Sequence, residues 1–442
     1  MFLSSKNIII LWRDFKIDII DIKESRDNNM KIENRFLKYV SFDTQSDPYS
    51  TTSPSTAKQK ELGEFLVEEM RILGLENVHM DEFGIVYGTI PSNNDHQGDV
   101  IGLIAHMDTS PDASDRGVNP KVIRDYDGSV ITLNAEKEMY LDPREFPELN
   151  EVIGHDIITT DGTTLLGADD KAGIAIIMSL AEYLFKHPDF KHNDIQIAFT
   201  PDEEVGRGTE HFNIEKFNAD YAYTVDGGHI SEFAFENFNA YSVNVYITGQ
   251  SVHPGSAKNK MINAANVALE FDRMLPIQKK PEFTEKREGF HHLTHIQGTC
   301  EKAKLEYIVR DHDFTELKNQ LNDFKRIQAY LNSYYGKELI DIEIKEQYLN
   351  MKEIIAETPH IVEQVEIAMK DVGITPQIEA IRGGTDGAAL SYKGLPCPNI
   401  GTGGFLCHGP HEFVSITMMK KGVELLLRLI RNNVYNQEDF PF

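Results

Sequence analysis

Cysteine is scarce in this chain, which has three in 442 residues: Cys300, Cys397 and Cys407. An odd and sparse set argues against a disulfide framework and fits a reducing compartment. Long apolar runs are also missing, because no stretch approaches the roughly 20 residues of a membrane span. The N-terminal run NIIILW is too short, charged residues follow it, and no small-residue cleavage site is evident. We therefore expect no signal peptide, no membrane association and a cytoplasmic location.

Positive charge is in short supply too. The chain has 44 Lys and Arg residues against 70 Asp and Glu residues, a formal net charge of −26. The overall field repels nucleic acid and anionic membranes, so neither is an expected partner. Carboxylates are also hard oxygen ligands for cations, so the surplus permits metal sites without proving them. The hydrophobic fraction of 40% is ordinary for a globular protein of more than one domain.

Apolar strand-like runs alternate with helical patterns through most of the chain. Residues 99–110 form an apolar run that turns polar at its end, and residues 165–185 indicate a loop followed by a largely buried helix. This alternation predicts an α/β fold whose sheet has at least some parallel strands. In such sheets ligands gather at the carboxyl ends of the strands. Polar residues recur at those ends here.

The order of elements changes near residue 238. From there to residue 349 the pattern reads β-α-β-β-α-β, which is typical of a ferredoxin-like domain. We therefore expect an α/β domain, residues 30–237 and 350–442, interrupted by an inserted ferredoxin-like domain, residues 238–349. Residues 1–29 are expected to be a poorly ordered extension ahead of an alternative start at Met30; an added helix packed on the domain is the other interpretation.

A set of polar residues follows the apolar runs: His106 and Asp108 in AHMD, Asp169 and Asp170 in GADDKAG, Glu203 and Glu204 in PDEE, Asp226 in TVDGG and His408 in CHGPHE. Imidazoles and carboxylates without thiolates suit zinc, and also cobalt or manganese. The set is larger than one tetrahedral site needs. It suits two metals bridged by a carboxylate, an arrangement that activates water for hydrolysis.

The spacing of His106 and Asp108 supports this interpretation. Residues two apart on a strand face the same way, so Asp108 can orient a metal-binding His106 ring. Each motif alone has a plainer explanation: Asp170 could be a helix cap, and PDEE a charged loop or helix start. Their coincidence at the ends of successive apolar runs favours a metal centre.

Seven motifs carry a resemblance to a known family. In order they are IAHMDTSPD, TTDGTTLLGADDKAGIA, AFTPDEEVGRG, YTVDGG, SVHPGSAK, IRGGTDGAALS and CHGPHEFV. They resemble those of peptidase T, the tripeptide aminopeptidases among the co-catalytic zinc exopeptidases that also include carboxypeptidase G and aminoacylase. The resemblance runs from about Met30 to the C-terminus, and it implies a mixed-sheet zinc-exopeptidase catalytic domain with the inserted ferredoxin-like domain as its lid.

The resemblance also implies roles for the polar residues. His106 and His408 would each bind one of two zinc ions, and Asp169 would bridge them. Glu204 and Asp226 would complete the two ligand sets. Asp108 would support His106, and Glu203 would be the general base that moves a proton from the attacking water to the leaving amine.

Three further residues would face the substrate. The resemblance implies that His253 polarises the scissile carbonyl, from its own chain or from a neighbouring subunit, although it could be a structural residue before a Pro-Gly turn. Arg382 in RGGTDG would hold the terminal carboxylate of the peptide, since a guanidinium binds such a group bidentately; a structural salt bridge is the alternative. Arg310 in YIVRDHD is a similar candidate, or an exposed charge at a strand end.

Several other residues are given no role. The histidines of FHHLTH are expected to be solvated or to pack in the lid. The resemblance implies His408 as the ligand rather than His411, because in the family a Glu, here Glu412, follows the ligand four residues later. Cys407 and His229 stay without assignment.

With the candidate ligand set, the resemblance implies a cytoplasmic dizinc aminopeptidase that acts on tripeptides, as a monomer or a homodimer. A dipeptidase, carboxypeptidase or amide deacylase of the same fold is the near alternative. A non-catalytic peptide- or metal-binding protein is the more distant one, and it would be expected to lack Glu203 or one of the ligands.

Overall fold

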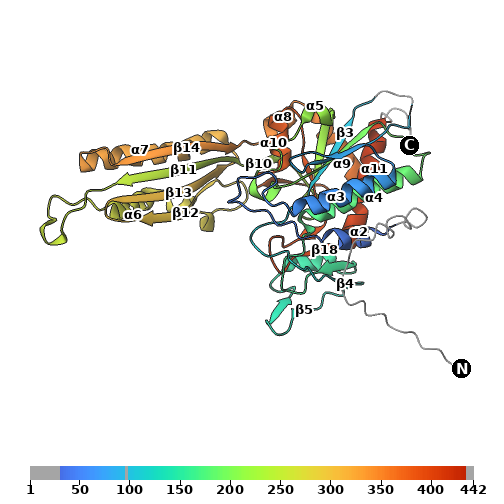
Figure 1. Cartoon of the computed structure of the whole chain (residues 1–442), viewed down its shortest axis with the longest axis horizontal. Helices are drawn as coiled ribbons and strands as arrows, with labels where there is room; N and C mark the ends of the chain where they lie inside the picture. The colour runs from blue at the N-terminus through green and yellow to red at the C-terminus, as the bar shows by residue number, and fades with distance from the viewer. Residues whose placement is uncertain (1–29, 95–97, 435–442) are drawn as a thin grey trace.

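The computed structural model describes residues 30–94 and 98–434. The extension expected at residues 1–29 lies outside the described residues. Figure 1 shows a larger body on the right and a narrower one projecting from it on the left. The larger body contains both ends of the described chain, and the smaller one is formed by the middle of the chain.

A mixed eight-stranded sheet forms the centre of the larger body. Four neighbouring strands, β8, β3, β9 and β16, are parallel, and strands at both sides of them run antiparallel to this group. In spatial order the strands are β1 (Glu76–Met80), β2 (Val86–Ile90), β8 (Ile195–Thr200), β3 (Ile101–His106), β9 (Tyr221–Val225), β16 (Asn399–Ile400), β10 (Glu232–Asn237) and β15 (Gln377–Ile381). The expected α/β fold with a mixed sheet is confirmed.

Helices cover the two faces of this sheet unequally. The larger core involves α2 (Ile32–Tyr39), α3 (Gln59–Leu73), α4 (Ala168–Lys186), α9 (Pro359–Asp371) and α11 (Ile416–Val434). The short helices α5 (Ile214–Phe217) and α10 (Asp386–Tyr392) contribute to a smaller core on the other face. Successive side chains of β3 point to opposite faces of the sheet and so pack in both cores. Leu103 and Ala105 belong to the larger core, and Ile104 belongs to the smaller one.

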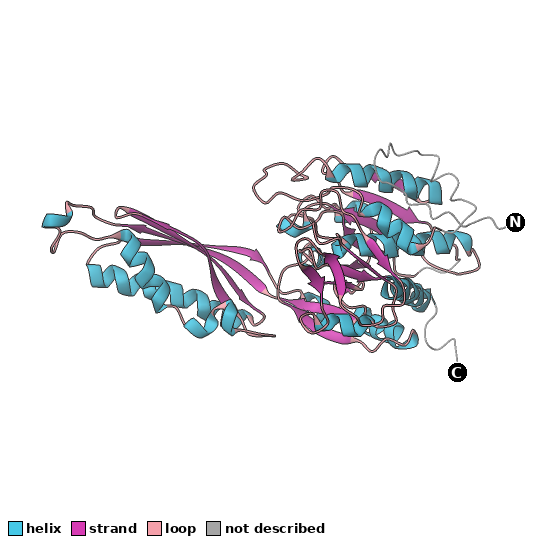
Figure 2. Ribbon diagram, turned by 90° about the horizontal axis from the view of Figure 1, so that it is seen from below, coloured by secondary structure: helices cyan, strands magenta, loops and turns pink. Residues whose placement is uncertain are grey.

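The inserted segment forms its own four-stranded antiparallel sheet. Its strands, in spatial order, are β12 (Phe290–Gly298), β13 (Lys302–Asp311), β11 (Asn239–Thr248) and β14 (Ile340–Tyr348). The helices α6 (Ala264–Met274) and α7 (Phe314–Tyr335) pack on one face of it, as Figure 2 shows, around a separate hydrophobic core. The order β11-α6-β12-β13-α7-β14 is the βαββαβ pattern expected from the sequence. The domain limits at residues 238 and 349 stay a proposal.

Two chain segments join this lid to the larger body, one before β11 and one between β14 and α8 (Lys352–Ala356). We call these two segments the hinge, and three asparagines bind them together. Asn350 Oδ1 accepts from the Asn237 N–H at 3.1 Å, Asn239 Oδ1 accepts from the Asn350 N–H at 3.0 Å, and Asn237 Oδ1 accepts from the Met351 N–H at 2.8 Å. In the described part of the chain no lid strand pairs with the eight-stranded sheet.

The remaining strands are short. A four-stranded sheet contains β17 (Gly404–Phe405), β18 (Phe413–Ser415), β7 (Ile157–Thr159) and β4 (Lys121–Ile123), and β5 (Ile131–Asn134) pairs with β6 (Met139–Leu141). Among residues 30–94 and 98–434, no helix is both long and apolar enough to span a bilayer.

Candidate active site

The expected metal ligands come together at the carboxyl ends of the parallel strands. His106 ends β3, Asp226 follows β9, and Asp169 lies at the start of α4. The ligand atoms of these three residues lie within 4.8 Å of one another. A second group, Asp169, Glu204 and His408, meets the same limit. The two groups share Asp169, as a bridging carboxylate requires.

Asp169 and Asp170 are neighbours with different surroundings. The backbone at both is non-helical, although both lie in the first turn of α4. Asp169 Oδ1 lies 2.8 Å from His106 Nε2. Asp170 is fully buried, and its carboxylate accepts hydrogen bonds of 3.2 Å from the N–H groups of His106 and Gly173. Asp170 therefore joins the end of β3 to the first turn of α4. This role is close to that of a helix cap, the alternative considered for Asp170 from the sequence.

Glu412 holds the loop that presents Asp169. Its buried carboxylate accepts from the N–H groups of Leu166 at 2.6 Å, Gly167 at 2.9 Å and Asp169 at 3.2 Å. Three backbone donors on one carboxylate fix the position of a short irregular segment. Glu412 thus supports the candidate bridging ligand through the backbone.

Asp108 contacts both His106 and the turn that carries the two glutamates. Its Oδ1 is 3.4 Å from His106 Nδ1, and its two oxygens accept from the N–H groups of Glu203 at 3.0 Å and Glu204 at 3.2 Å. The side chain has no exposed surface. The His106 Nδ1 also lies 3.1 Å from the Asp108 carbonyl, so Asp108 orients the imidazole through its backbone and its side chain. Its carboxylate also fixes the turn that carries the adjacent acids.

His408 lies where the motif spacing places it. Its Nε2 is 3.0 Å from Glu204 Oε2 and 3.3 Å from Asp169 Oδ2. His411 instead packs its ring against Phe146, with 4.8 Å between ring centres. The geometry thus favours His408 over His411 as the ligand.

The charges of this cluster favour bound cations. Burial, together with the neighbouring Asp169, raises the pKa of Asp226 to about 7. Hydrogen bonds to Asp169 and Glu204 raise the pKa of His408 to about 11. Within the described residues the buried Glu204 Oε1 has no hydrogen-bond partner. Carboxylate and imidazole donors with an unpaired buried oxygen fit two divalent cations of the zinc, cobalt or manganese type.

A cavity of about 830 Å³ opens beside the cluster. This volume is within the roughly 300–1,000 Å³ typical of small-ligand sites. Its lining includes the candidate ligands Asp169, Glu204, Asp226 and His408, and also Glu203. In the described part of the chain the Glu203 carboxylate has no hydrogen bond or ion pair, while its backbone N–H is bonded to Asp108. Burial raises the pKa of this carboxyl well above its usual value.

Arg382 lines the same cavity but is already partly engaged. Its Nη1 donates to the carbonyls of Lys286 at 2.5 Å and Glu288 at 3.0 Å, and its Nη2 donates to Thr284 Oγ1 at 3.1 Å. These bonds use three of the five guanidinium donors. Arg382 therefore joins the larger body to a lid loop, residues 284–288, and in the described part of the chain two of its five donors have no hydrogen-bond partner.

Arg310 is placed differently from the expectation. It is buried and is not among the residues that line the cavity. Its guanidinium lies over the ring of Tyr348 at 5.1 Å, and Nη1 donates to the carbonyls of Tyr241 and Val309. Its exposed strand-end alternative is wrong, because only 9% of the residue is exposed.

His253 is not brought to the cavity by its own chain. The residue is exposed, and its Nδ1 accepts from the Gly255 N–H at 3.1 Å. It follows β11, a strand of ten residues that leads from the hinge toward the far end of the lid (Figure 1). At about 3.4 Å per residue, this strand alone spans roughly 30 Å.

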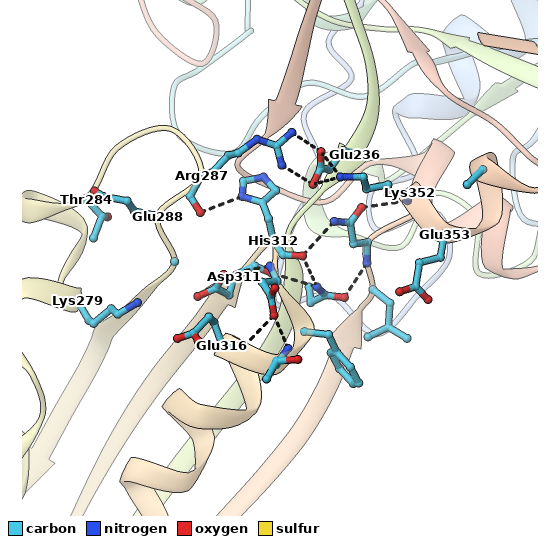
Figure 3. Close-up of a pocket in the computed structure, with 18 of the residues that line it drawn as sticks. Glu236, Lys279, Thr284, Arg287, Glu288, Asp311, His312, Glu316, Lys352 and Glu353 are labelled. Carbon is cyan, nitrogen blue, oxygen red and sulfur yellow. Dashed lines mark hydrogen bonds and ion pairs between the residues drawn. The ribbon is translucent and has the colours of Figure 1, made fainter. Parts of the chain in front are cut away.

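A larger cavity, of about 1140 Å³, lies at the hinge and contains none of the candidate ligands. Figure 3 shows Arg287 of the lid loop meeting Glu236 at the end of β10, with Lys352 on the other side of that carboxylate. Arg287 Nη1 lies 2.6 Å from Glu236 Oε1. His312 Nε2 is 3.1 Å from the Ile381 carbonyl. The crevice is therefore bordered by contacts that join the lid to the larger body.

The residues left without a role stay outside the cluster. His291 is buried against Phe324, whereas His292 and His295 are exposed on β12. His229 Nε2 is 3.5 Å from Glu151, and Cys407 is partly buried. None of these residues lines the cavity beside the ligands.

Tyr348 and Asp386 are among the residues of the cavity wall that sequence reasoning missed. Asp386 lies in the RGGTDG motif, and its Oδ2 accepts from Thr200 at 2.7 Å. Tyr348 is the last residue of the last lid strand, so the only available signal was its position at the expected boundary between the domains.

Comparison with known proteins identifies the family. The model of peptidase family M20/M25/M40 matches residues 161–432. The chain belongs to this peptidase family. A protein from Clostridium acetobutylicum named peptidase T is 49% identical over 404 residues, 90% of this chain and 98% of the relative. Peptidase T of Clostridium perfringens is 51% identical over 401 residues, 91% and 98% of the two chains. The resemblance to peptidase T is confirmed.

Solved structures share the M20 fold. Aminopeptidase PepT from Bacillus cereus superposes with a TM-score of 0.73 at 24% identity, over 92% of this chain and 99% of that one. A Bacillus subtilis protein described as a dinuclear metal-binding M20 peptidase has a TM-score of 0.59 at 13% identity, over 90% and 98% of the chains. At these identities the structures bear on the fold alone.

Proposed function

We propose that this M20 peptidase is a dizinc aminopeptidase that releases the N-terminal residue from tripeptides. The observation that carries the proposal is the pair of ligand groups that share Asp169 and border a cavity with an unengaged Glu203. The relatives named peptidase T, about half identical over nine-tenths of the chain, support the substrate class.

His106 and Asp226 would hold one zinc ion, Glu204 and His408 the other, and Asp169 both. Zinc bound there would supply Lewis acidity, which polarises the scissile carbonyl and lowers the pKa of the attacking water. Glu203 would take the proton of that water and deliver it to the leaving amine. Asp108 would keep the His106 ring oriented. Cobalt or manganese would be substitutes in the same ligand set.

The cavity has groups that suit a short peptide. Arg382 has two guanidinium donors that stay available for a terminal carboxylate, and Lys286 also lines the wall. His253 could serve a metal centre only if a second copy of the chain brought it there, since its own chain holds it elsewhere. We therefore keep both a monomer and a homodimer in the proposal. The three free cysteines support a reducing, cytoplasmic location.

The test is a panel of free, N-blocked and C-amidated di-, tri- and tetrapeptides, with and without a chelator. We expect cleavage of free tripeptides that is lost with the chelator. Preference for N-blocked substrates would instead favour a deacylase or carboxypeptidase of the same fold.

Two variants separate the proposed roles of the adjacent glutamates. Glu203→Gln should retain two equivalents of zinc and lose turnover, whereas Glu204→Gln should bind zinc more weakly as well. A Glu203→Gln protein with normal turnover would rule out the general base.

A further inference from the structure

Tyr348 brings a hydroxyl from the lid to the catalytic cavity. It is the last residue of β14 and lines the cavity together with Glu203. Gly384, in the RGGTDG motif, makes room for its ring, because a Cβ at that position would lie 2.7 Å from Tyr348 Cε1. A lid residue is therefore part of the wall of the cavity that the candidate metal ligands line.

Arg310 supports this ring across the lid sheet. In the strand register both Arg310 and Tyr348 pair with Ala240 of the intervening strand β11. Residues opposite one another share a face of the sheet, and the small alanine lets the guanidinium extend over the tyrosine ring at 5.1 Å. In the described part of the chain no carboxylate lies within ion-pair distance of Arg310, although it is buried. An unneutralised cation is thus held against one aromatic ring.

Electrostatics connect this pair to the catalytic groups. Burial raises the pKa of the Tyr348 hydroxyl, the Arg310 guanidinium opposes that shift, and the Glu203 carboxylate adds to it. Tyr348 therefore lies within electrostatic range of both groups. His253, the other candidate for contact with the scissile carbonyl, is exposed and absent from this cavity.

We propose that Tyr348 is a catalytic residue whose hydroxyl donates a hydrogen bond to the oxygen that becomes negative on the scissile carbonyl, and that Arg310 positions and polarises this hydroxyl. The proposal rests on the peptidase function proposed above. A preorganised donor at a developing oxyanion strengthens its hydrogen bond in the transition state, and removal of one such donor costs about 10²–10³ in kcat. A cation over the ring makes the hydroxyl a stronger donor.

The primary test is Tyr348→Phe, which removes one oxygen and keeps the ring against Arg310 and Gly384. We expect kcat for a free tripeptide to fall about 100-fold, with KM within about twofold and two zinc equivalents retained. A phosphinic tripeptide analogue, which carries a charged tetrahedral centre, should bind about 100-fold more weakly. The matched control is Tyr246→Phe on the exposed face of β11, which should change neither value.

A second variant guards against a purely structural effect. Gly384→Ala keeps the hydroxyl but displaces the ring, so it should also lower kcat and weaken the phosphinic analogue. Normal kcat and normal analogue affinity in Tyr348→Phe would overturn the proposal while the peptidase function stood. A wild-type enzyme that cleaves no tripeptide would instead overturn the function on which it rests.

Arg310 is tested through its dependence on Tyr348. Arg310→Met should lower kcat, Arg310→Lys should restore part of the loss, and the double variant Arg310→Met/Tyr348→Phe should be little worse than Tyr348→Phe alone. If Arg310→Met instead raises KM for free tripeptides but not for C-amidated ones, Arg310 binds the substrate carboxylate directly and the positioning role is wrong.

Discussion

Glu412→Gln should weaken zinc binding without touching a candidate ligand. Glu412 accepts three backbone N–H groups from the loop that carries Asp169, two on Oε2 and one on Oε1. The amide replaces one acceptor with an NH₂ group that faces a buried N–H, which costs about 1–3 kcal/mol. The other bonds lose their charge assistance, at about 1 kcal/mol each.

Part of this cost will appear as lower stability of the whole domain and part as displacement of Asp169. Loss of a partner that orients a metal ligand typically reduces metal affinity by about 10- to 100-fold. We expect a change of that size, measured by competition with a chromophoric zinc chelator. A urea unfolding curve of the metal-free protein measures the part of the cost that appears as lower domain stability.

The control is Glu424→Gln on α11, where the carboxylate is exposed and pairs with Lys421 at 2.6 Å. It should leave zinc affinity unchanged. Zinc affinity within twofold of wild type in Glu412→Gln would show that the loop keeps its position without the three bonds, and would refute the reasoning.

Three further predictions concern orientation, core and hinge. Asp108→Asn should lower zinc affinity at least about tenfold in chelator competition, because its amide group can no longer accept from both backbone donors; unchanged affinity would contradict this role. Arg35→Met should destabilise the protein by about 3–5 kcal/mol in urea unfolding, because it leaves the buried Glu69 carboxylate without the guanidinium 2.8 Å away; a smaller loss would mean that the acid becomes protonated. Burial alone would raise the pKa of Glu236, but its partner Arg287 outweighs that effect and lowers the pKa. The stability that this pair contributes is therefore present above the usual pKa of 4.5 and lost as pH falls below it. Glu236→Gln should reduce stability at pH 7 and have little effect at acid pH, and equal losses at both pH values would refute the ion pair.

The polar residues that directly follow an apolar strand could be predicted as site residues, because the end of each strand can be recognised in the sequence. His106 and Asp108 are two residues apart at the end of an apolar run, and the structure places the Asp108 carboxylate 3.4 Å from His106 Nδ1. Helix and strand patterns also predicted the order of elements in the lid, since each amphipathic segment covers one core.

Contacts between distant segments could not be predicted in this way. The position of Arg310 depends on strand pairing across Ala240, and nothing near YIVRDHD shows that a tyrosine 38 positions later lies beneath it. The engagement of Arg382 with residues 284–288 likewise depends on how the lid meets the larger body. His253 was assigned from its motif alone, and only the length of β11 shows where its own chain carries it.

The hinge held by the three asparagines makes it possible to remove the lid from the chain. The chain enters and leaves the lid through adjacent segments joined by Asn237, Asn239 and Asn350, and the lid has its own hydrophobic core. Excision of residues 239–349 would therefore leave two chain ends side by side, which a short linker could rejoin. The lid is in this sense a removable module, although its removal would also take Tyr348 from the cavity.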